Sequence, residues 1–293
     1  MTRLLSAPAR PPRGLLRITG EDRATFLQGL VSNDVLAVGE RHGIWAALLT
    51  PQGKYLHDFF VVGQGEALLI DGEGARIADL KRRLSMFRLR AKVAVDDVGE
   101  GFEVWHGWGG GALDAFDLAE PGAARPVGDA FVLADPRLPA LGIRLIAPKG
   151  RGGALLAERG FSAGDWADWD LLRLSLGVPD GSRDLVAEKS ILLESGFDEL
   201  NGVSWTKGCY MGQELTARTK YRGLVKKRLM PVRIDGPLPS PGTPVMKDGA
   251  EAGEIRSGQD QTALALIRLD ALDAPLTAGE ARIIPLRPDW ARW

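Results

Sequence analysis

The chain has 293 residues, with 37 Lys and Arg against 38 Asp and Glu, so its formal net charge is −1. Apolar residues make up 45% and charged residues 26%, which is ordinary for a soluble globular protein of two or three domains. This balance gives no support to a nucleic-acid-binding surface, which needs a concentrated excess of Lys and Arg. The short basic runs at 81–83 and 226–228 are interpreted as solvated faces.

The sequence holds one cysteine, Cys209, so no disulfide can form within the chain. There is no apolar stretch typical of a signal peptide, and together these features indicate a reducing compartment. We therefore expect a cytoplasmic protein. Residues 1–13 are rich in Arg and Pro and are expected to form a loose arm. No run approaches the roughly 18 apolar residues of a membrane helix, so we expect no membrane partner.

The first hundred residues alternate between strand-like and helix-like patterns. The spacing of apolar residues predicts, in chain order, a strand at 15–18, a helix at 20–32 capped by Thr19, strands at 44–50, 55–62 and 67–70, a helix at 75–87 and a strand at 89–95. The turn residues Pro51-Gln52-Gly53-Lys54 join two of these strands into a predicted β-hairpin. Strands with a helix between the last two are typical of a ferredoxin-like α+β unit.

From about residue 99 the pattern changes. Surface loops are expected at 107–111 and 121–126, where Gly and Pro are dense. The patterns further predict strands at 131–134 and 143–146, and helices at 151–159 and 165–176. Trp166 and Trp169 belong to an apolar stripe of the last helix, which is more typical of a core than of a stacking surface. After Gly223, strands and Pro/Gly turns predict a small all-β domain.

Metal binding and serine-based hydrolysis receive little support from the residues. His42, His57 and His106 lie far apart in the sequence, and none stands at ligand spacing from Cys209. No nucleophile-elbow motif anchors a Ser–His–Asp arrangement. We therefore expect no metal site.

Residues 206–214, Thr-Lys-Gly-Cys-Tyr-Met-Gly-Gln-Glu, are the most informative segment. Gly208 and Gly212 bracket the thiol, so the backbone can turn sharply and a ligand can approach closely. Lys207 stands two residues before the thiol, and a short helix is predicted from Gln213. A cation and a helix N-terminus favour the thiolate, which is a nucleophile or a metal ligand. The residues alone leave a second interpretation equally open, in which Cys209 is a small buried apolar residue.

Residues 207–214 resemble the K-G-C-Y-x-G-Q-E signature of the YgfZ family. That family is a folate-binding branch related to the glycine-cleavage T-protein, an aminomethyltransferase, and it includes the mitochondrial Iba-type iron–sulfur assembly factors. Further segments are similar to family motifs in the same order: F-L-Q-G at 26–29, S-N-D-V at 32–35, L-T-P-Q-G-K at 49–54, F-R-L-R at 87–90 and L-G-V-P at 176–179. The resemblance covers about residues 14–290.

The resemblance implies an α+β fold of three domains around a central hole that holds the folate. The expected folate-binding domain, which carries the cysteine motif, comprises 1–38 and 99–224. The expected ferredoxin-like insert comprises 39–98, and the expected small C-terminal β-barrel comprises 225–293.

The resemblance also implies tetrahydrofolate, or a one-carbon derivative of it, as cofactor. The residues expected to bind it, carried over by motif, are Gln28, Asn33, Asp34, Tyr210, Gln213, Glu214, Arg218 and Arg222. The residues expected to carry chemistry are Cys209, Lys207 and Asp58. The chain departs from the transferase in two places: His57 precedes Asp58 where the transferase has paired aspartates, and Ser175 stands where it has a pterin-binding glutamate. Both departures argue against a fully retained aminomethyl transfer.

The leading hypothesis is a folate-binding accessory factor for the assembly or repair of iron–sulfur enzymes, acting through Cys209. Because an iron–sulfur cluster takes several ligands, one thiolate requires a partner, and iron–sulfur proteins or assembly-machinery proteins are the expected partners. One alternative is a one-carbon transferase with Asp58 as general base. The other is a non-catalytic folate-binding regulator in which Cys209 only packs.

Overall fold

The computed structural model describes residues 4–223 and 225–293. The chain divides into two compact units. The first contains the residues up to Leu48, His57–Trp169 and Asn201–Met211; the second contains Leu49–Leu56, Asp170–Leu200 and the residues from Gly212 on. Within the described ranges, no helix is long and apolar enough to cross a membrane.

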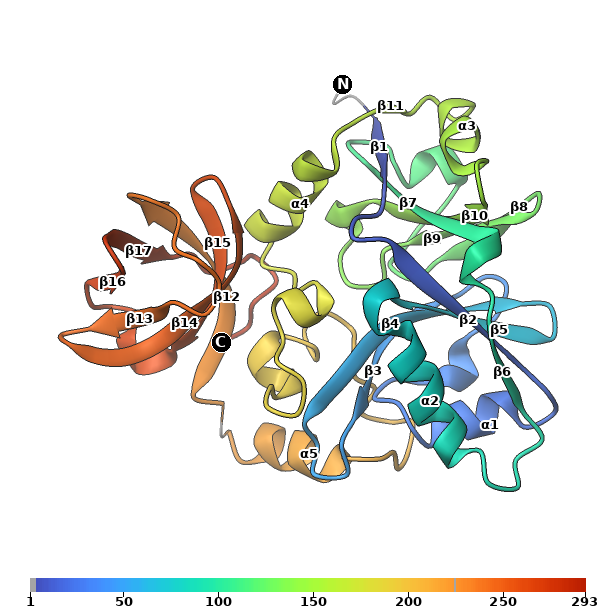
Figure 1. Ribbon diagram of the computed structural model, residues 1–293, viewed down its shortest axis with the longest axis horizontal. Helices are drawn as coiled ribbons and strands as arrows, with labels where there is room; N and C mark the ends of the chain where they lie inside the picture. Colours follow the sequence, from blue (N-terminus) through green and yellow to red (C-terminus); the bar gives the residue numbers. More distant parts are fainter. Residues whose placement is uncertain (1–3, 224) are drawn as a thin grey trace. The chain divides into compact units, whose positions relative to one another are not determined.

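A five-stranded sheet forms one half of the first unit (Figure 1). Its strand order is β3 (Ile44–Leu49), β4 (Tyr55–Gln64), β5 (Ala67–Glu73), β2 (Arg13–Thr19) and β6 (Ala94–Asp97). Helices α1 (Arg23–Gln28) and α2 (Ile77–Phe87) accompany it. All of β3 and nearly all of β4 are buried, so β3 is continuously apolar, whereas β4 carries the buried polar residues His57 and Asp58 among apolar ones.

A six-stranded sheet forms the other half of the first unit. Its order is β11 (Ser162–Ala163), β1 (Leu5–Pro8), β7 (Phe102–Trp108), β10 (Ile143–Pro148), β9 (Ala130–Ala134) and β8 (Ala124–Val127). Helix α3 (Gly152–Ala157) contacts β7, and helix α4 (Trp166–Ser175) follows β11. The apolar core of this half includes Phe116, Val132, Leu145, Leu156 and Phe161.

The predicted N-terminal arm is wrong for its described part, because β1 pairs with both β7 and β11. Residues 1–3 of that arm lie outside the described residues. The predicted loops at 107–111 and 121–126 are also partly wrong. Gly107 ends up inside β7, and residues 124–126 belong to β8, because strand pairing overrides their local preference for turns.

Two further predictions in the first unit need correction. The helix predicted at 20–32 is shorter: Asp22 occupies its N-cap position, Thr19 belongs to β2, and α1 ends at Gln28. The strand predicted at 89–95 begins only at Ala94. Leu89 has a positive φ of 43°, which is incompatible with an extended strand.

The predicted β-hairpin, the strands at 15–18, 67–70, 131–134 and 143–146, and the helices at 75–87, 151–159 and 165–176 are all present within a few residues. The predicted domain boundaries stay a prediction, and the one at residue 224 lies outside the described residues. One finding bears on them: β2, from the segment 1–38, pairs with β5 and β6, so the five-stranded sheet is not built from 39–98 alone.

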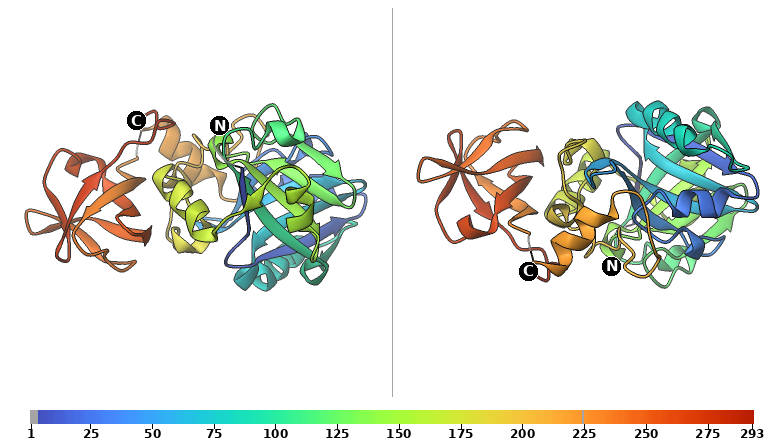
Figure 2. Two further views of the ribbon diagram at one scale, coloured as in Figure 1. Left: turned by 90° about the horizontal axis from the view of Figure 1, so that it is seen from above. Right: turned by 90° about the horizontal axis from the view of Figure 1, so that it is seen from below.

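The second unit contains helix α5 (Gln213–Tyr221) and a closed barrel. The barrel order is β12 (Lys227–Asp235), β15 (Thr262–Arg268), β14 (Ala250–Gln259), β13 (Pro244–Lys247), β16 (Leu276–Ala278) and β17 (Ala281–Pro285). Figure 2 shows the barrel from two further directions. Met230, Val232 and Ile234 alternate along β12 into its core, as a two-residue period requires. The predicted α+β class and C-terminal β-barrel are confirmed.

A buried ionic network ties α4 to the barrel within the second unit. Arg173 is fully buried, and it donates to Asp170 Oδ1 at 2.6 Å and to Asp184 Oδ2 at 2.7 Å. Its Nη2 donates to Ser257 Oγ on β14 at 2.7 Å. A buried guanidinium is tolerated because its charge is paired and its N–H groups have acceptors. Sequence reasoning missed this network, because its members are spread from position 170 to position 257.

Candidate functional site

The thiol of Cys209 is exposed, in the first unit, at the end of the segment Asn201–Met211. Gly208 before it has a φ of +93°, and a Cβ at that glycine would meet nothing within 4 Å. Tyr210 after it is buried. The interpretation of Cys209 as a buried residue is therefore wrong, because the thiol lies on a turn that faces solvent while its neighbour supplies the packing.

Hydrogen bonds join this segment to the loop that follows α1. The backbone N–H of Met211 donates to the carbonyl oxygen of Gly29 at 3.0 Å, and that of Ser204 donates to Ser32 at 3.0 Å. The hydroxyl of Ser32 donates to the carbonyl oxygen of Gly202 at 2.6 Å. The cysteine segment is thus held at both ends, although about 170 residues separate the two stretches in the sequence.

Lys207 holds the cysteine segment to the loop after α1 through three hydrogen bonds. Its Nζ donates to the carbonyl oxygens of Gln28 and Val31, each at 2.6 Å, and of Asn33 at 2.9 Å. An ammonium has three N–H groups, so all are used. Burial lowers the pKa of Lys207 to about 8, and the charge of Asp34 opposes that shift. The geometry gives Lys207 a positioning role, which differs from the predicted catalytic role because no N–H remains for the thiol.

Three residues predicted to bind folate also support this loop. Gln28 Nε2 donates to Asp34 Oδ1 at 2.9 Å. Asn33 Nδ2 donates to the carbonyl oxygens of Trp45 and Asn201, each at 2.8 Å. Their folate contacts stay a prediction, and their observed hydrogen bonds hold the two stretches of chain together.

Asp58 lies elsewhere in the first unit, buried on β4. The indole Nε1 of Trp45 donates to its Oδ2 at 2.9 Å. Beside this pair, the guanidinium of Arg137 lies 5.6 Å from the centre of the Trp45 ring and 5.0 Å from that of Phe60. Asp58 is therefore a buried carboxylate next to aromatic rings and a cation.

Two further arginines approach Phe60, and sequence reasoning missed both. Arg144 lies 3.8 Å from the centre of that ring, and it shares the buried carboxylate of Asp71 with Arg13. Burial lowers the pKa of Arg144 to about 10, while Asp71 opposes the shift. No spacing in the sequence indicates this cluster, because its members come from β2, β4, β5 and β10.

Two of the three histidines are packed against other side chains. His57 Nε2 lies 2.8 Å from Asp79 Oδ2 on α2, and burial lowers the pKa of His57 to about 4. His106 stacks on Trp169 with ring centres 3.9 Å apart, and burial holds its pKa well below the usual value. In the part of the chain that the structure describes, no group of three His, Cys, Asp or Glu residues could hold a metal ion. His57 and Asp58 are consecutive on a strand, so they face opposite sides of the sheet.

The remaining predicted folate-binding residues divide between the units. Tyr210 belongs to the first unit, and its ring centre lies 5.1 Å from Lys207 Nζ. The others lie in the second unit, on or directly after the confirmed helix α5: Gln213, Glu214, Arg218 and Arg222. Glu214, Arg218 and Arg222 are exposed. Their role in folate binding stays a prediction.

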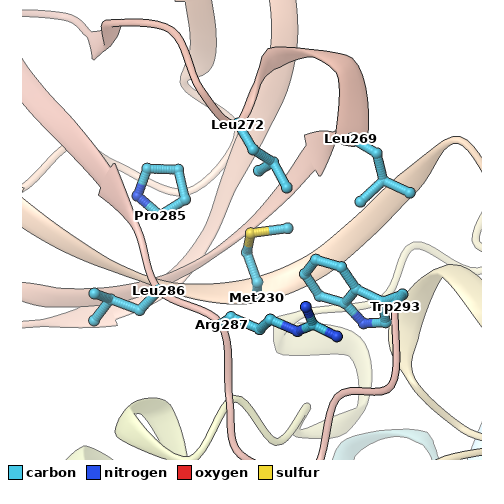
Figure 3. Close-up of a pocket in the computed structure, with 7 residues that line it drawn as sticks. All are labelled: Met230, Leu269, Leu272, Pro285, Leu286, Arg287 and Trp293. Atoms are coloured by element: carbon cyan, nitrogen blue, oxygen red, sulfur yellow. The ribbon is translucent and has the colours of Figure 1, made fainter.

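The barrel carries a pocket of about 400 Å³ that the sequence analysis did not indicate (Figure 3). Its lining is mainly apolar: Met230, Leu269, Leu272, Pro285, Leu286, Arg287 and Trp293. The guanidinium of Arg287 lies 5.3 Å from the centre of the Trp293 ring. The lining holds neither a nucleophile nor a general base, so it offers a place for an apolar group and no chemistry.

Comparison with known proteins first defines the class of fold. Residues 226–293 match the family model of the CAF17 C-terminal beta-barrel domain. The structure is similar to the glycine cleavage system aminomethyltransferase T from Bartonella henselae, with a TM-score of 0.77 over 98% of this chain and 85% of that chain. The two sequences are 14% identical, so this likeness shows the fold alone. The chain has the fold of an aminomethyltransferase T.

Sequence comparison then defines the family. The mitochondrial iron-sulfur cluster assembly factor IBA57 of Mus musculus is 34% identical over 303 residues, which cover 95% of this chain and 83% of that protein. The protein of the same name from Homo sapiens is 36% identical over 304 residues, with the same coverage. The chain belongs to the IBA57 family of iron–sulfur cluster assembly factors. The predicted resemblance to Iba-type factors and to the T-protein is confirmed.

The same relatives overturn the predicted cytoplasmic location. Both are named as mitochondrial. The prediction rested on a single cysteine, which excludes an internal disulfide and so indicates a reducing compartment. That argument does not distinguish the cytosol from a reducing compartment inside an organelle.

Proposed function

We propose that this assembly factor acts through the thiol of Cys209, supplied to an iron–sulfur cluster that is being assembled or repaired. The observation that carries the proposal is an exposed thiol on a segment that Lys207 holds against the loop after α1 through three hydrogen bonds. An exposed cysteine can meet a large partner, and a fastened segment presents it in one orientation, which lowers the entropy lost on binding.

Cys209 supplies one ligand, and a partner supplies the others. Thiolates hold iron–sulfur clusters in sets, so one cysteine completes a cluster only together with groups from elsewhere. The partners are iron–sulfur proteins or proteins of the assembly machinery. The cluster is the cargo of this reaction, and the chain itself presents the thiolate. The ammonium of Lys207 is held by backbone carbonyl groups, so it does not pair with the thiolate in place of iron.

Tetrahydrofolate, or a one-carbon derivative of it, is proposed as the cofactor. Asp58 fits by its chemistry, because a buried carboxylate can accept the paired N–H groups of a pterin edge. Gln28 and Asn33 fit less well, since their amide groups are engaged in the loop. Arg218 or Arg222 would hold the glutamate tail. When bound, the folate would supply or accept a one-carbon unit.

A one-carbon transferase is the weaker alternative. Its paired carboxylates are missing, because His57 faces Asp79 on the opposite side of the sheet from Asp58. Ser175, in place of the transferase glutamate, donates its hydroxyl to the carbonyl oxygen of Leu172 in its own helix. The regulator alternative, in which Cys209 packs, loses its basis because that thiol is exposed.

Complementation tests the thiol. A bacterial strain that lacks its own factor of this type would receive wild type or Cys209→Ala, and the product of an iron–sulfur methylthiotransferase, methylthiolated tRNA, would be measured. We expect wild type to restore the product and the variant to leave it absent at matched protein levels. Equal restoration by both would sink the proposal, because the thiol would then be dispensable.

Folate binding has a separate test. Calorimetric titration with tetrahydrofolate is expected to detect binding to wild type and to Cys209→Ala alike, and weaker binding to Asp58→Asn. Arg233→Gln, at an exposed residue of the barrel, is the matched control and should bind as wild type. Absence of binding to wild type removes folate from the proposal and leaves the role of the thiol standing.

A further inference from the structure

Six consecutive exposed residues, 85–90, end α2 and begin the loop to β6 (Figure 1). Three of them are large and apolar: Met86 is 64% exposed, Phe87 40% and Leu89 87%. In the described part of the chain seven large apolar residues are exposed, so nearly half of them lie in this short stretch. Contiguous exposed apolar groups mark a contact with something outside the fold.

Two backbone hydrogen bonds shape the loop, which holds Leu89 in a costly conformation. The N–H of Arg88 donates to the carbonyl oxygen of Ser85 at 3.2 Å, and that of Ala91 donates to Arg88 at 2.7 Å. Within this turn Leu89 has a φ of 43°, in the left-handed region that favours Gly and Asn. A leucine here costs backbone energy and gains no burial in return. Retained strain of this kind points to a use outside the fold.

The same stretch is strongly basic. Between 81 and 92 the cations are Lys81, Arg82, Arg83, Arg88, Arg90 and Lys92, and there is no carboxylate. Asp79 pairs with two of these arginines, while Glu21 and Asp22 bond to Lys92. Six cations therefore face three carboxylates, an excess of three positive charges on a chain whose net charge is −1. The run at 81–83 is thus part of a larger surface and not only a solvated face.

We propose that residues 81–92, here named the basic tip, dock on an anionic lipid membrane, with Met86, Phe87 and Leu89 entering the headgroup region. A membrane-surface contact combines apolar side chains that enter the interface with cations that attract acidic headgroups. The basic tip presents both kinds of side chain, apolar and cationic, within residues 81–92. Arg88 and Arg90 alternate with the apolar residues, so insertion of one set brings the other to the headgroups.

A protein partner fits the basic tip less well. A stable protein interface takes roughly 20–30 residues on each side, whereas the exposed stretch here has six. A fluid lipid surface closes around a small convex tip and needs no matching concave surface. The expectation of no membrane partner rested on the lack of a spanning segment, and a peripheral contact requires none.

Vesicle co-sedimentation tests the proposal with the full-length chain. The probes are vesicles of phosphatidylcholine alone, and vesicles in which about one lipid in three is phosphatidylglycerol. Wild type is expected to bind the second kind, and to bind less in high salt because salt screens exposed charges. The double variant Phe87→Ser, Leu89→Asn should lose about tenfold or more in vesicle affinity, since binding scales with the apolar area that enters the interface.

The variants are chosen so that folding is not in question. Asn adopts a left-handed φ readily, so Leu89→Asn relieves strain while removing the apolar side chain; unchanged thermal unfolding will confirm this. Arg88→Gln with Arg90→Gln should also weaken binding. The matched controls are Leu238→Ser for the apolar pair and Arg233→Gln with Arg282→Gln for the charges, all exposed in the barrel. These controls should bind vesicles as wild type does.

Two results would overturn the proposal. One is that wild type does not sediment with anionic vesicles. The other is that the basic-tip variants sediment as well as wild type. If such variants bind vesicles normally and yet fail to restore methylthiolated tRNA in cells, the basic tip is a protein-binding surface and the membrane assignment is wrong.

Discussion

The Nζ atom of Lys207 lies 2.6 Å from the carbonyl oxygen of Val31, across two stretches of chain that are 176 positions apart. Its other two hydrogen bonds go to Gln28 and Asn33, so one ammonium closes the turn after α1. Buried backbone carbonyl groups need hydrogen-bond donors, and this one ammonium supplies a donor to each of the three. This relationship makes Lys207 the residue that sets the position of the cysteine segment.

Replacing Lys207 by Met should therefore free the segment. Methionine has similar length and no donor, so three carbonyl groups lose their partners at a cost of about 1–3 kcal/mol in the free energy of unfolding. We expect the cysteine to react at an altered rate with iodoacetamide and methylthiolated tRNA to fall. Lys207→Arg should recover only part of this, because a planar guanidinium does not direct three N–H groups to one turn.

The control for this change is Lys149→Met, at an exposed lysine of the same unit. It should leave urea unfolding, thiol reactivity and complementation unchanged. If Lys207→Met reacts and complements as wild type does, the three hydrogen bonds do not position the thiol.

His57 makes stability depend on pH between about 4 and 6.5. Burial lowers its pKa from 6.5 to about 4, so in this window the unfolded chain binds a proton that the folded chain does not. Acidification therefore favours unfolding, and stability falls as the pH drops from 6.5 towards 4. The full effect is at most about 3.5 kcal/mol, since one pKa unit corresponds to about 1.4 kcal/mol.

Urea unfolding at a series of pH values measures this dependence. His57→Gln removes the titrating group, and its stability should fall less between pH 6.5 and 4.5 than that of wild type. His42→Gln, at a half-buried histidine, is the control and should keep the wild-type slope. Parallel curves for wild type and His57→Gln would show that another group titrates.

Arg173→Met should strongly destabilise the second unit. The change leaves the buried carboxylate of Asp184 without its cation, while Asp170 keeps its ion pair with Arg183, and breaking such a buried pair costs about 3–5 kcal/mol. Adding Asp184→Asn should cost less than the sum of the single changes, because the neutral amide no longer needs that cation. Urea unfolding measures both changes, with Arg282→Met as the exposed control in the same unit. A loss below about 1 kcal/mol in the free energy of unfolding for Arg173→Met would contradict the role of the network.

Most helices and strands could be predicted from the sequence, whereas the candidate site around Cys209 could be predicted only in part. Periodicity predicts α2 and the barrel because both bury one face against a neighbour close in the chain. Spacing places Lys207 beside Cys209, yet its direction depends on hydrogen bonds to residues 28–33, which no local pattern reveals. The cluster of Arg13, Asp71 and Arg144 is hidden for the same reason, since it exists only once distant strands pack.

Gly53 and Gly212 lie so close together in space that neither position has room for a side chain. A Cβ on Gly53 would lie 2.6 Å from the carbonyl oxygen of Gly212, and a Cβ on Gly212 would lie 3.0 Å from the Cα of Gly53. Both residues also have positive φ, +83° and +78°. The hairpin turn and the start of α5 therefore approach through two positions that tolerate no side chain.

Gly212→Ala should consequently destabilise the second unit by more than the backbone cost alone. A left-handed conformation costs an alanine about 1–2 kcal/mol, and the clash with the hairpin turn adds to this. The matched control is Gly242→Ala, whose φ is +89° and whose Cβ would meet nothing within 4 Å. Urea unfolding should show a larger loss for Gly212→Ala than for Gly242→Ala. Because the two share the backbone penalty, equal losses would mean that the close approach of the two glycines contributes nothing to stability.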